Sequence, residues 1–155
     1  MTRSERVADS QRGNAGAATL RGLMHTSVVT ATPETTVAEA AAAMVSAKVG
    51  STVIMQGSFL AGILTERDVL RAAGSGEDLS RSLVSDWMTP DPQSVEPDSS
   101  VEAAAQIMLL NGFRHLPVVD GRHVCGVVSL RDLFAARIRR ARPNADERQT
   151  ATAPG

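Results

Sequence analysis

The chain repeats itself at a constant spacing of 64 residues. The segment from Gly62 to Asp68 returns 64 residues later, from Gly126 to Asp132, with its glycine, hydroxyl residue and aspartate in the same places. The spacing holds without a gap for six further pairs: Met24 and Met88, Pro33 and Pro97, Val37 and Val101, Ala40 and Ala104, Met44 and Met108, Gly57 and Gly121. An internal repeat of this kind predicts two copies of one supersecondary unit. Because each copy has only about 60 residues and buries little surface alone, we expect the copies to pack together with two related clefts between them.

Hydrophobic periodicity and turn residues give each copy the order β-α-β-β-α. The sequence therefore predicts an α/β (α+β) fold of two pseudo-symmetric repeats packed through their sheets. We expect a disordered tail at 1–19, the first repeat at 20–74, a linker at 75–83, the second repeat at 84–140 and a second disordered tail at 141–155.

Each repeat contains one helix with a core-facing apolar stripe. The stripe residues are Val37, Ala40, Ala41, Met44 and Val45 in the first repeat and Val101, Ala104, Ala105, Met108 and Leu109 in the second. Capping boxes at Thr36–Glu39 and Ser99–Glu102 predict the helix starts. Gly50 and Gly112 are the expected C-terminal stops. The predicted strands are 28–29, 52–55, 60–64, 93–95, 116–119 and 124–128.

Composition removes several functional classes. Sixteen basic and seventeen acidic residues give a net charge of −1, which does not favour nucleic acid or an anionic membrane as partner. Lys48 is the single lysine and, at the end of a predicted helix, is read as solvated, which argues against lysine-dependent catalysis. Cys125 is the single cysteine, so no disulfide framework forms within one chain. No apolar run is long enough for a membrane span, and no secretory signal is seen, so we expect a cytoplasmic protein.

The repeated Gly-x-x-(Thr/Ser)-x-x-Asp segment lies where a predicted strand turns into a helix. Thr65 and Ser129 fit N-cap positions, and Asp68 and Asp132 complete capping boxes three residues later. The same geometry suits a ligand, because a hydroxyl and free amides at a helix start bind phosphate and a carboxylate accepts hydrogen bonds from a ribose diol. Capping boxes are common, so spacing alone favours the structural interpretation, although the two interpretations are compatible.

The sequence resembles the cystathionine β-synthase (CBS) domain family. The resemblance rests on the duplicated Gly-hydrophobic-x-Thr/Ser-x-x-Asp signature, on Asp86-Trp87-Met88-Thr89 at the entry to a repeat, and on the segment 114–120, Arg-His-Leu-Pro-Val-Val-Asp. It extends over roughly residues 20–138. Two such domains in tandem form a Bateman module, and the resemblance implies that fold here.

The resemblance also implies adenosine-containing ligands in two inter-repeat clefts: AMP, ADP or ATP, and in some members S-adenosylmethionine or NAD. By position, one cleft would use Thr65, Asp68, Gln93, Val95, Phe113, Arg114 and His115. The other would use Ser129, Asp132, Val28, Thr30, Val49, Gly50 and Ser51. The aspartates would hold ribose hydroxyls, the Thr/Ser hydroxyls would lie near ribose or phosphate, and the remaining residues would hold the adenine.

The two expected clefts are not equivalent. Arg114 and His115 supply phosphate donors where the first repeat has only Gly50 and Ser51. The first repeat also has Val53 where the second has Pro117, a departure from the family's common pattern. Since both aspartates and both hydroxyls are present, we expect both clefts to bind, with unequal affinity.

The remaining chemical side chains give weaker signals. Arg67 and Arg131 fit phosphate binding and solvated helix positions equally well. The three histidines, His25, His115 and His123, lack metal-ligand spacing, so we expect no metal site. Cys125 is expected to be a small buried hydrophobe, and Trp87 to anchor the entry segment against the core. The arginines at 137–142 favour a helix C-terminus, with a nucleic-acid arm as the less favoured alternative.

Three functions are compatible with the sequence. The favoured one is a regulatory sensor without catalysis, needing no cofactor, taking an adenine nucleotide as regulatory ligand and acting on an unidentified effector protein. A ligand-free interaction scaffold is the second, although the retained Asp68 and Asp132 argue against it. A small nucleotide hydrolase using those carboxylates is the third. We also expect a homodimer that pairs through the helices around 37–47 and 101–111.

Overall fold

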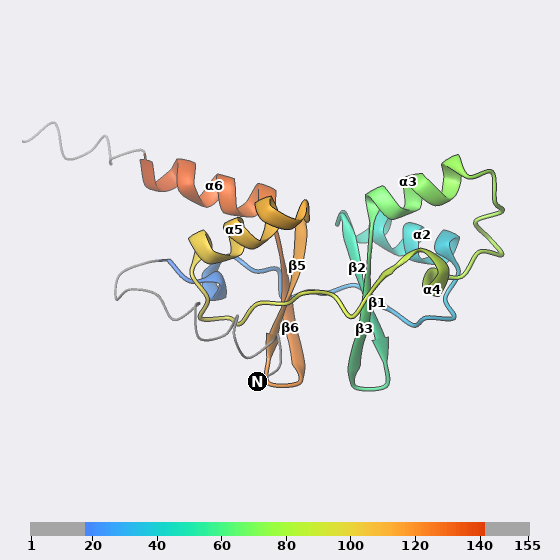
Figure 1. Ribbon diagram of the computed structural model, residues 1–155, viewed down its shortest axis with the longest axis horizontal. Helices are drawn as coiled ribbons and strands as arrows, with labels where there is room; N and C mark the ends of the chain where they lie inside the picture. The colour runs from blue at the N-terminus through green and yellow to red at the C-terminus, as the bar shows by residue number, and fades with distance from the viewer. Residues whose placement is uncertain (1–17, 142–155) are drawn as a thin grey trace, which may run out of the picture.

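The computed structural model describes residues 18–141 and shows a mixed α+β molecule made of two similar halves. In Figure 1 the two sheets stand at the centre of the molecule and face each other, while the helices lie on the outer sides. The predicted α+β class and the pairing of two repeats through their sheets are therefore confirmed. The tails predicted at 1–19 and 141–155 fall, apart from residues 18, 19 and 141, outside the described residues.

The first half holds a four-stranded sheet in the order β1-β2-β3-β4. Its elements are β1 (Thr30–Ala31), α2 (Val37–Ala47), β2 (Ser51–Gln56), β3 (Phe59–Thr65), α3 (Glu66–Gly74) and β4 (Thr89–Pro90). β1 runs parallel to β2, whereas β2–β3 and β3–β4 are antiparallel. The first strand therefore begins two residues later than the predicted 28–29.

The second half holds a shorter version of the same sheet. Its elements are α5 (Val101–Asn111), β5 (His115–Asp120), β6 (His123–Ser129) and α6 (Leu130–Ala141). β5 and β6 are antiparallel, and single bridges flank them, one parallel between Val95 and Val118 and one antiparallel between His25 and Val127. These bridges lie 64 residues from pairings of the first sheet. The strand predicted at 93–95 is thus reduced to one bridging residue.

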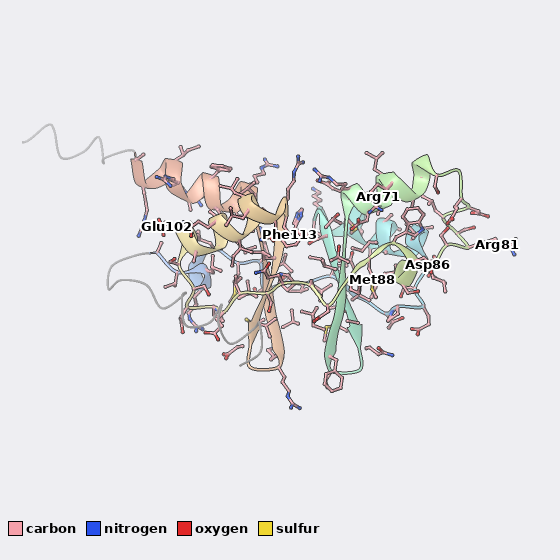
Figure 2. The ribbon with its side chains drawn as sticks, in the orientation of Figure 1. Arg71, Arg81, Asp86, Met88, Glu102 and Phe113 are labelled. Atoms are coloured by element: carbon pink, nitrogen blue, oxygen red, sulfur yellow. The ribbon has the colours of Figure 1, made fainter. Side chains whose placement is uncertain are left out.

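The short segments that lead into the repeats are exchanged between the halves. η1 (Leu20–Gly22) packs on the second half, where Leu20 is fully buried and its N–H donates to the carbonyl of Ser99 at 3.0 Å. α4 (Val84–Trp87) packs on the first half, where Val84 is fully buried and its N–H donates to the carbonyl of Thr35 at 2.8 Å. Figure 2 shows Met88, which follows α4, on the first half. Each half is completed by a segment that precedes the other in sequence.

The helix ends follow the predictions only in part. Thr36 and Glu39 form the predicted capping box at α2. At α5 the N-cap is Ser100, and its side chain accepts a hydrogen bond from the N–H of Ala103, so the capping box predicted at Ser99–Glu102 is wrong. α5 ends at Gly112, with φ 71°, as predicted. α2 ends on Lys48 in the left-handed conformation, with φ 56°, and not on Gly50.

The apolar stripes of α2 and α5 are buried only along part of their width. In α2 the side chains of Val37, Ala40 and Met44 are buried, and their counterparts in α5 are buried as well. Val45 is 78% exposed and Leu109 is 66% exposed, so the prediction that both face the core is wrong. One apolar edge of each helix therefore remains on the outside of the molecule.

Candidate functional site

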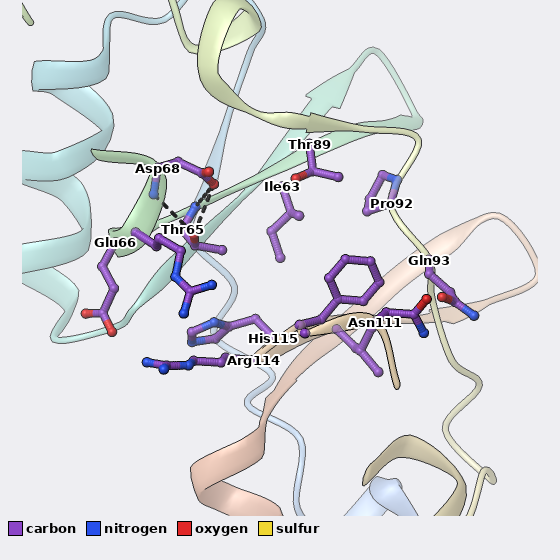
Figure 3. A pocket seen from close by; sticks show the side chains of 14 residues that line it. Ile63, Thr65, Glu66, Asp68, Thr89, Pro92, Gln93, Asn111, Arg114 and His115 are labelled. Atoms are coloured by element: carbon purple, nitrogen blue, oxygen red, sulfur yellow. Dashed lines mark hydrogen bonds between the residues drawn. The ribbon is translucent and has the colours of Figure 1, made fainter. Parts of the chain in front are cut away.

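Two clefts lie where the halves meet, and each contains one of the repeated aspartates. The Asp68 cleft, of about 260 Å³, is bordered by the end of β3, the start of α3 and residues 111–116 of the other half. Figure 3 shows this cleft with Thr65 and Asp68 on one side and Arg114 and His115 on the other. The Asp132 cleft, of about 1080 Å³, is bordered by the start of α6, residues 27–29 and residues 48–51.

Local hydrogen bonds fix the Asp68 carboxylate. Its Oδ2 accepts from the N–H of Thr65 at 2.9 Å and from the Thr65 hydroxyl at 3.0 Å. Its Oδ1 forms an ion pair with the guanidinium of Arg71 at 3.2 Å. The residue as a whole is 7% exposed. The motif thus caps α3, as the sequence predicts, and also holds a carboxylate in one orientation at the cleft.

Asp132 repeats this arrangement with a different outer partner. Its Oδ2 accepts from the N–H of Ser129 at 3.1 Å and from the Ser129 hydroxyl at 2.6 Å. The Nε2 atom of His25 lies 3.1 Å from the same oxygen. Because the segment containing His25 is exchanged between the halves, this contact joins the N-terminal entry segment to the motif of the second repeat.

The environment of Asp132 stabilises its charged form. Burial opposes ionisation of the carboxyl, but hydrogen bonds from the hydroxyl and N–H of Ser129 and from His25 outweigh it and lower the pKa of Asp132. The carboxylate is therefore ionised at neutral pH and remains an acceptor. An ionised carboxylate is a stronger acceptor than a neutral group for hydroxyl donors such as those of a vicinal diol.

Both clefts share one wall, made of Glu66, Arg114 and His115. Two equivalent backbone bonds position it: the N–H of Glu66 donates to the carbonyl of Gly50 at 3.0 Å, and the N–H of Leu130 donates to that of Arg114 at 2.8 Å. These bonds tie the start of each motif helix to the residue before the neighbouring strand. Backbone hydrogen bonds consequently join the start of each motif helix to the segment that precedes β2 or β5.

His115 is the most enclosed polar residue of the wall. Burial lowers the pKa of its imidazole, although the nearby Glu66 and Asp132 carboxylates act in the opposite direction. Its Nδ1 atom is buried and has no hydrogen-bond partner among residues 18–141. A Cβ atom added at Gly50 would lie 3.0 Å from its Nε2 atom, so the glycine makes room for the ring.

The structure brings together most of the residues that the sequence assigned to each cleft. Thr65, Asp68, Gln93, Phe113, Arg114 and His115 line the Asp68 cleft. Ser129, Asp132, Val28, Val49, Gly50 and Ser51 line the Asp132 cleft. Figure 2 shows Phe113 near the middle of the molecule, on the side of the second half that faces the first.

Thr30 and Val95 do not line either cleft. Thr30 opens β1 beside Val53 and is exposed. Val95 is 2% exposed and belongs to the core of the second half. The clefts are lined instead by residues that precede these two in sequence, Val28 and Val29 before Thr30 and Gln93 before Val95. The two assignments are corrected accordingly.

Several lining residues were not predicted. Glu66, which directly follows Thr65 in sequence, lines both clefts. His25 lines the Asp132 cleft, and Thr89 lines the Asp68 cleft at the equivalent position. The 64-residue spacing pairs His25 with Thr89, which is a signal that the sequence already contained. Lys48, read from the sequence as a solvated helix end, also borders the Asp132 cleft. Arg67 and Arg131, left open between two interpretations, line the Asp68 and Asp132 clefts respectively.

The other candidates have structural surroundings. Cys125 is half-buried, its thiol donates to the carbonyl of Val118 at 3.3 Å, and burial raises its pKa. Trp87 packs against the core of the first half with the Arg71 guanidinium 5.8 Å from its ring centroid. Within residues 18–141, no three His, Cys, Asp or Glu side chains gather as metal ligands. None of the helices in that part of the chain is long and apolar enough to cross a membrane.

Comparison with known proteins identifies the family. The sequence model of the CBS domain matches residues 20–75 and 84–139. The chain therefore belongs to the CBS-domain family and carries two such domains in tandem, as in a Bateman module. CBS domains are in general regulatory modules and not catalytic ones.

Curated relatives and a solved structure agree with this assignment. An uncharacterised 17.7 kDa protein of Acidianus ambivalens is 42% identical over 72% of this chain and 68% of its own length. The CBS domain-containing protein YhcV of Bacillus subtilis is 36% identical over 74% of this chain and 81% of its own. The crystal structure of CBSX2 in complex with AMP matches with a TM-score of 0.68 and 26% identity, over 80% of this chain and 98% of that one.

Proposed function

We propose that this chain is a regulatory module that binds adenosine-containing ligands in the clefts between its two CBS domains. The candidate ligands are AMP, ADP and ATP, with S-adenosylmethionine and NAD as further members of the same class. The observation that carries the proposal is the oriented carboxylate that each repeat places at a cleft between the halves. The AMP complex of CBSX2, a protein of the same fold, supports the choice of ligand class.

The lining of each cleft offers partners for every part of such a ligand. Asp68 and Asp132 would accept hydrogen bonds from the ribose diol, each charge-assisted. Apolar side chains border the same spaces for an adenine ring, Ile63 and Phe113 in one cleft and Val28 and Val49 in the other. Arg67 and Arg131, one residue before the aspartates, provide guanidinium groups for phosphate.

Ligand binding would change the relative orientation of the two halves and would not break covalent bonds of the ligand. A ligand in either cleft touches both repeats, because each cleft is lined from both sides. It therefore stabilises the relative orientation that it fits best and shifts the population toward it. The carboxylates serve as fixed acceptors in this scheme, and we propose no catalytic step. An effector protein would sense the orientation or the surface it exposes.

We further propose that two copies pair through α2 and α5. Val45, Leu109 and Leu110 are 78%, 66% and 85% exposed on these helices. Pairing would remove these apolar side chains from water, at roughly 25 cal/mol per Å² of apolar surface. Sedimentation velocity of the wild type and of Leu110→Glu tests this: a dimer that the substitution converts to monomer is expected. A wild type that sediments as a 16.3 kDa monomer at all concentrations contradicts the pairing.

A thermal-shift panel with AMP, ADP, ATP, NAD and S-adenosylmethionine tests the ligand proposal. A ligand at 100 times its Kd adds about 2.7 kcal/mol, which for a chain of this size raises Tm by roughly 5–11 °C. Asp68→Asn and Asp132→Asn should each reduce the shift, since an amide nitrogen cannot accept from the diol. Asp120→Asn, at an exposed aspartate that lines neither cleft, is the matched control and should leave it unchanged.

The alternative is that the chain is an interaction scaffold whose clefts bind none of these ligands. In that case no compound in the panel raises Tm, and the aspartate variants change stability only through their helix caps. That result would reject the sensor proposal.

A further inference from the structure

The wall between the clefts contains one permanent cation for two sites. Glu66, Arg114 and His115 border both the Asp68 cleft and the Asp132 cleft, and Figure 3 shows the three of them lining the Asp68 cleft. The residue 64 positions before Arg114 is Gly50. The first repeat therefore adds no guanidinium to the wall, and the two clefts depend on the same one.

The rest of the wall cannot replace this charge. A side chain at Gly50 would meet the His115 ring, whose Nε2 atom would lie 3.0 Å from the new Cβ. His115 itself is kept neutral at neutral pH by burial, which lowers its pKa. Glu66, the third member, is an anion. Arg114 thus supplies all the positive charge that the wall offers.

The charged residues that line each cleft show how its net charge changes when Arg114 binds a phosphate in the other cleft. In the Asp68 cleft, Arg67 and Arg114 balance Glu66 and Asp68, so without Arg114 the lining becomes net negative. In the Asp132 cleft, two further cations, Lys48 and Arg131, balance Glu66 and Asp132 even without it. The Asp68 cleft is therefore the more dependent of the two.

We propose that Arg114 is a phosphate-binding residue shared by both clefts, so that a phosphorylated nucleoside in one cleft weakens binding of a second in the other. A guanidinium that pairs its charge and two of its N–H groups with a phosphate in one cleft has less of both to offer a phosphate in the other cleft. The Asp132 cleft takes the phosphorylated ligand first, and the Asp68 cleft then favours an uncharged adenosine derivative. The inference rests on the proposed function, and the weakening is reciprocal.

Isothermal titration calorimetry with AMP and with adenosine tests this, because the two ligands differ only in the phosphate. Asp132→Asn protein reports the AMP affinity of the Asp68 cleft alone, and Asp68→Asn protein that of the Asp132 cleft. In the wild type we expect AMP to bind in two steps. The Kd of the second step should be about tenfold or more higher than the Kd of the Asp68 cleft measured alone, which is the loss expected from one charge-assisted hydrogen bond. Adenosine should show no such difference.

Arg114→Ala identifies the residue responsible. Its main-chain carbonyl still accepts from the N–H of Leu130, so the local backbone bond is retained. In this variant the AMP affinity of both clefts should fall, whereas the adenosine affinity should not. The ratio of the Kd values for the two AMP binding steps should become smaller than in the wild type. Arg122→Ala, at an exposed arginine in the turn between β5 and β6, should behave as wild type. Circular dichroism melts confirm that each variant is folded.

Two results would overturn the inference. One is AMP filling both clefts of the wild type with the affinities of the single-cleft variants. The other is Arg114→Ala protein that binds AMP as the wild type does or keeps the full gap between steps. Both leave the proposed function intact, because AMP still binds. If the wild type binds neither AMP nor adenosine and no compound of the thermal-shift panel raises its Tm, the proposed function is rejected, and the inference with it.

Discussion

The two clefts use the same carboxylate in different surroundings. Asp68 is held from the side by Arg71, one turn further along its own helix, whereas Asp132 is contacted by His25 from the far end of the chain. The 64-residue counterpart of Arg71 is Ala135, and that of His25 is Thr89. Each copy has thus retained the acceptor and its hydroxyl cap while the outer partner has changed. In this duplicated fold the carboxylate and its hydroxyl cap stay the same while the basic partner beside them differs.

The same contrast holds for size and charge. The Asp132 cleft measures about 1080 Å³ against about 260 Å³ for the Asp68 cleft, and only the larger one is bordered by Lys48. The larger cleft also reaches Phe134 and Ile138 of α6, which are 54% and 60% exposed. We therefore expect the two clefts to favour ligands of different size and charge within the proposed ligand class.

The largest expected effects come from the two cores. Leu64 and its counterpart Val128 are fully buried in separate hydrophobic clusters. Leu64→Ala should lower the free energy of unfolding by about 2–5 kcal/mol, and Val128→Ala by somewhat less because a smaller side chain is lost. Because the entry segments are exchanged, we expect the two halves to unfold together. In each variant the urea transition should therefore shift by the same amount whether it is followed by Trp87 fluorescence or by circular dichroism.

Independent unfolding of the halves would give a different pattern. Trp87 packs on the first half, so Val128→Ala would then shift the circular dichroism transition and leave the fluorescence transition in place. That outcome would contradict the interlocked fold.

Next in size are the glycines that admit the exchanged segments. A Cβ at Gly62 would lie 2.5 Å from the Met88 sulfur and 2.9 Å from the Thr89 carbonyl oxygen, and a Cβ at Gly126 would lie 2.9 Å from the His25 carbonyl oxygen. Each Gly→Ala substitution should cost about 1–3 kcal/mol in urea unfolding, typical of overpacking. Gly22→Ala, where nothing lies within 4 Å, is the control and should cost less. Equal costs at all three sites would show that the close approach does not matter.

A smaller effect is expected from the hydroxyl caps. Ser129→Ala and Thr65→Ala each remove a bond to the motif aspartate and should cost about 0.5–2 kcal/mol at pH 7. The lowered pKa of Asp132 stabilises the fold above the pKa of the unfolded carboxyl, near 4, and this contribution is lost as pH falls through the folded value. The cost of Ser129→Ala should therefore shrink at pH 3. A cost independent of pH would contradict the charge-assisted bond.

The smallest effect concerns His115. Because burial lowers its pKa, the unfolded chain takes up a proton near pH 6.5 that the folded chain does not, so stability falls as pH drops below that value. His115→Gln should flatten the dependence of Tm on pH between 7.5 and 5. The change in slope should correspond to less than one proton taken up per molecule on unfolding. His123→Gln, at an exposed histidine, is the control. An unchanged slope in His115→Gln would contradict the enclosed, neutral imidazole.

The repeat predicted much of this structure because two copies of a pattern constrain each other. The 64-residue spacing, with the motif at each strand-to-helix junction, was enough to place Asp68 and Asp132 and their hydroxyl caps correctly. The residues at 113–115 were assigned to the Asp68 cleft by position, through the resemblance to CBS domains, and they line that cleft. The repeat and its motifs can be recognised in the sequence without knowledge of the tertiary contacts.

The failures concern contacts that periodicity does not contain. A short apolar segment such as the one around Val84 does not reveal which half it packs on, so the exchange and the role of His25 were missed. A two-residue strand fixes its register only through tertiary pairing, and Thr30 and Val95 were misplaced for this reason. Val45 and Leu109 continue a helical stripe in sequence, yet the core is not wide enough to cover them.

The most direct test of the account is equilibrium dialysis of AMP at saturating concentration against four proteins: wild type, Asp68→Asn, Asp132→Asn and the double variant. We expect AMP binding by the wild type, about one AMP per chain for each single variant and none for the double variant, with all four proteins folded by circular dichroism. AMP binding that survives in the folded double variant would show that the paired aspartates are not the ligand-binding groups.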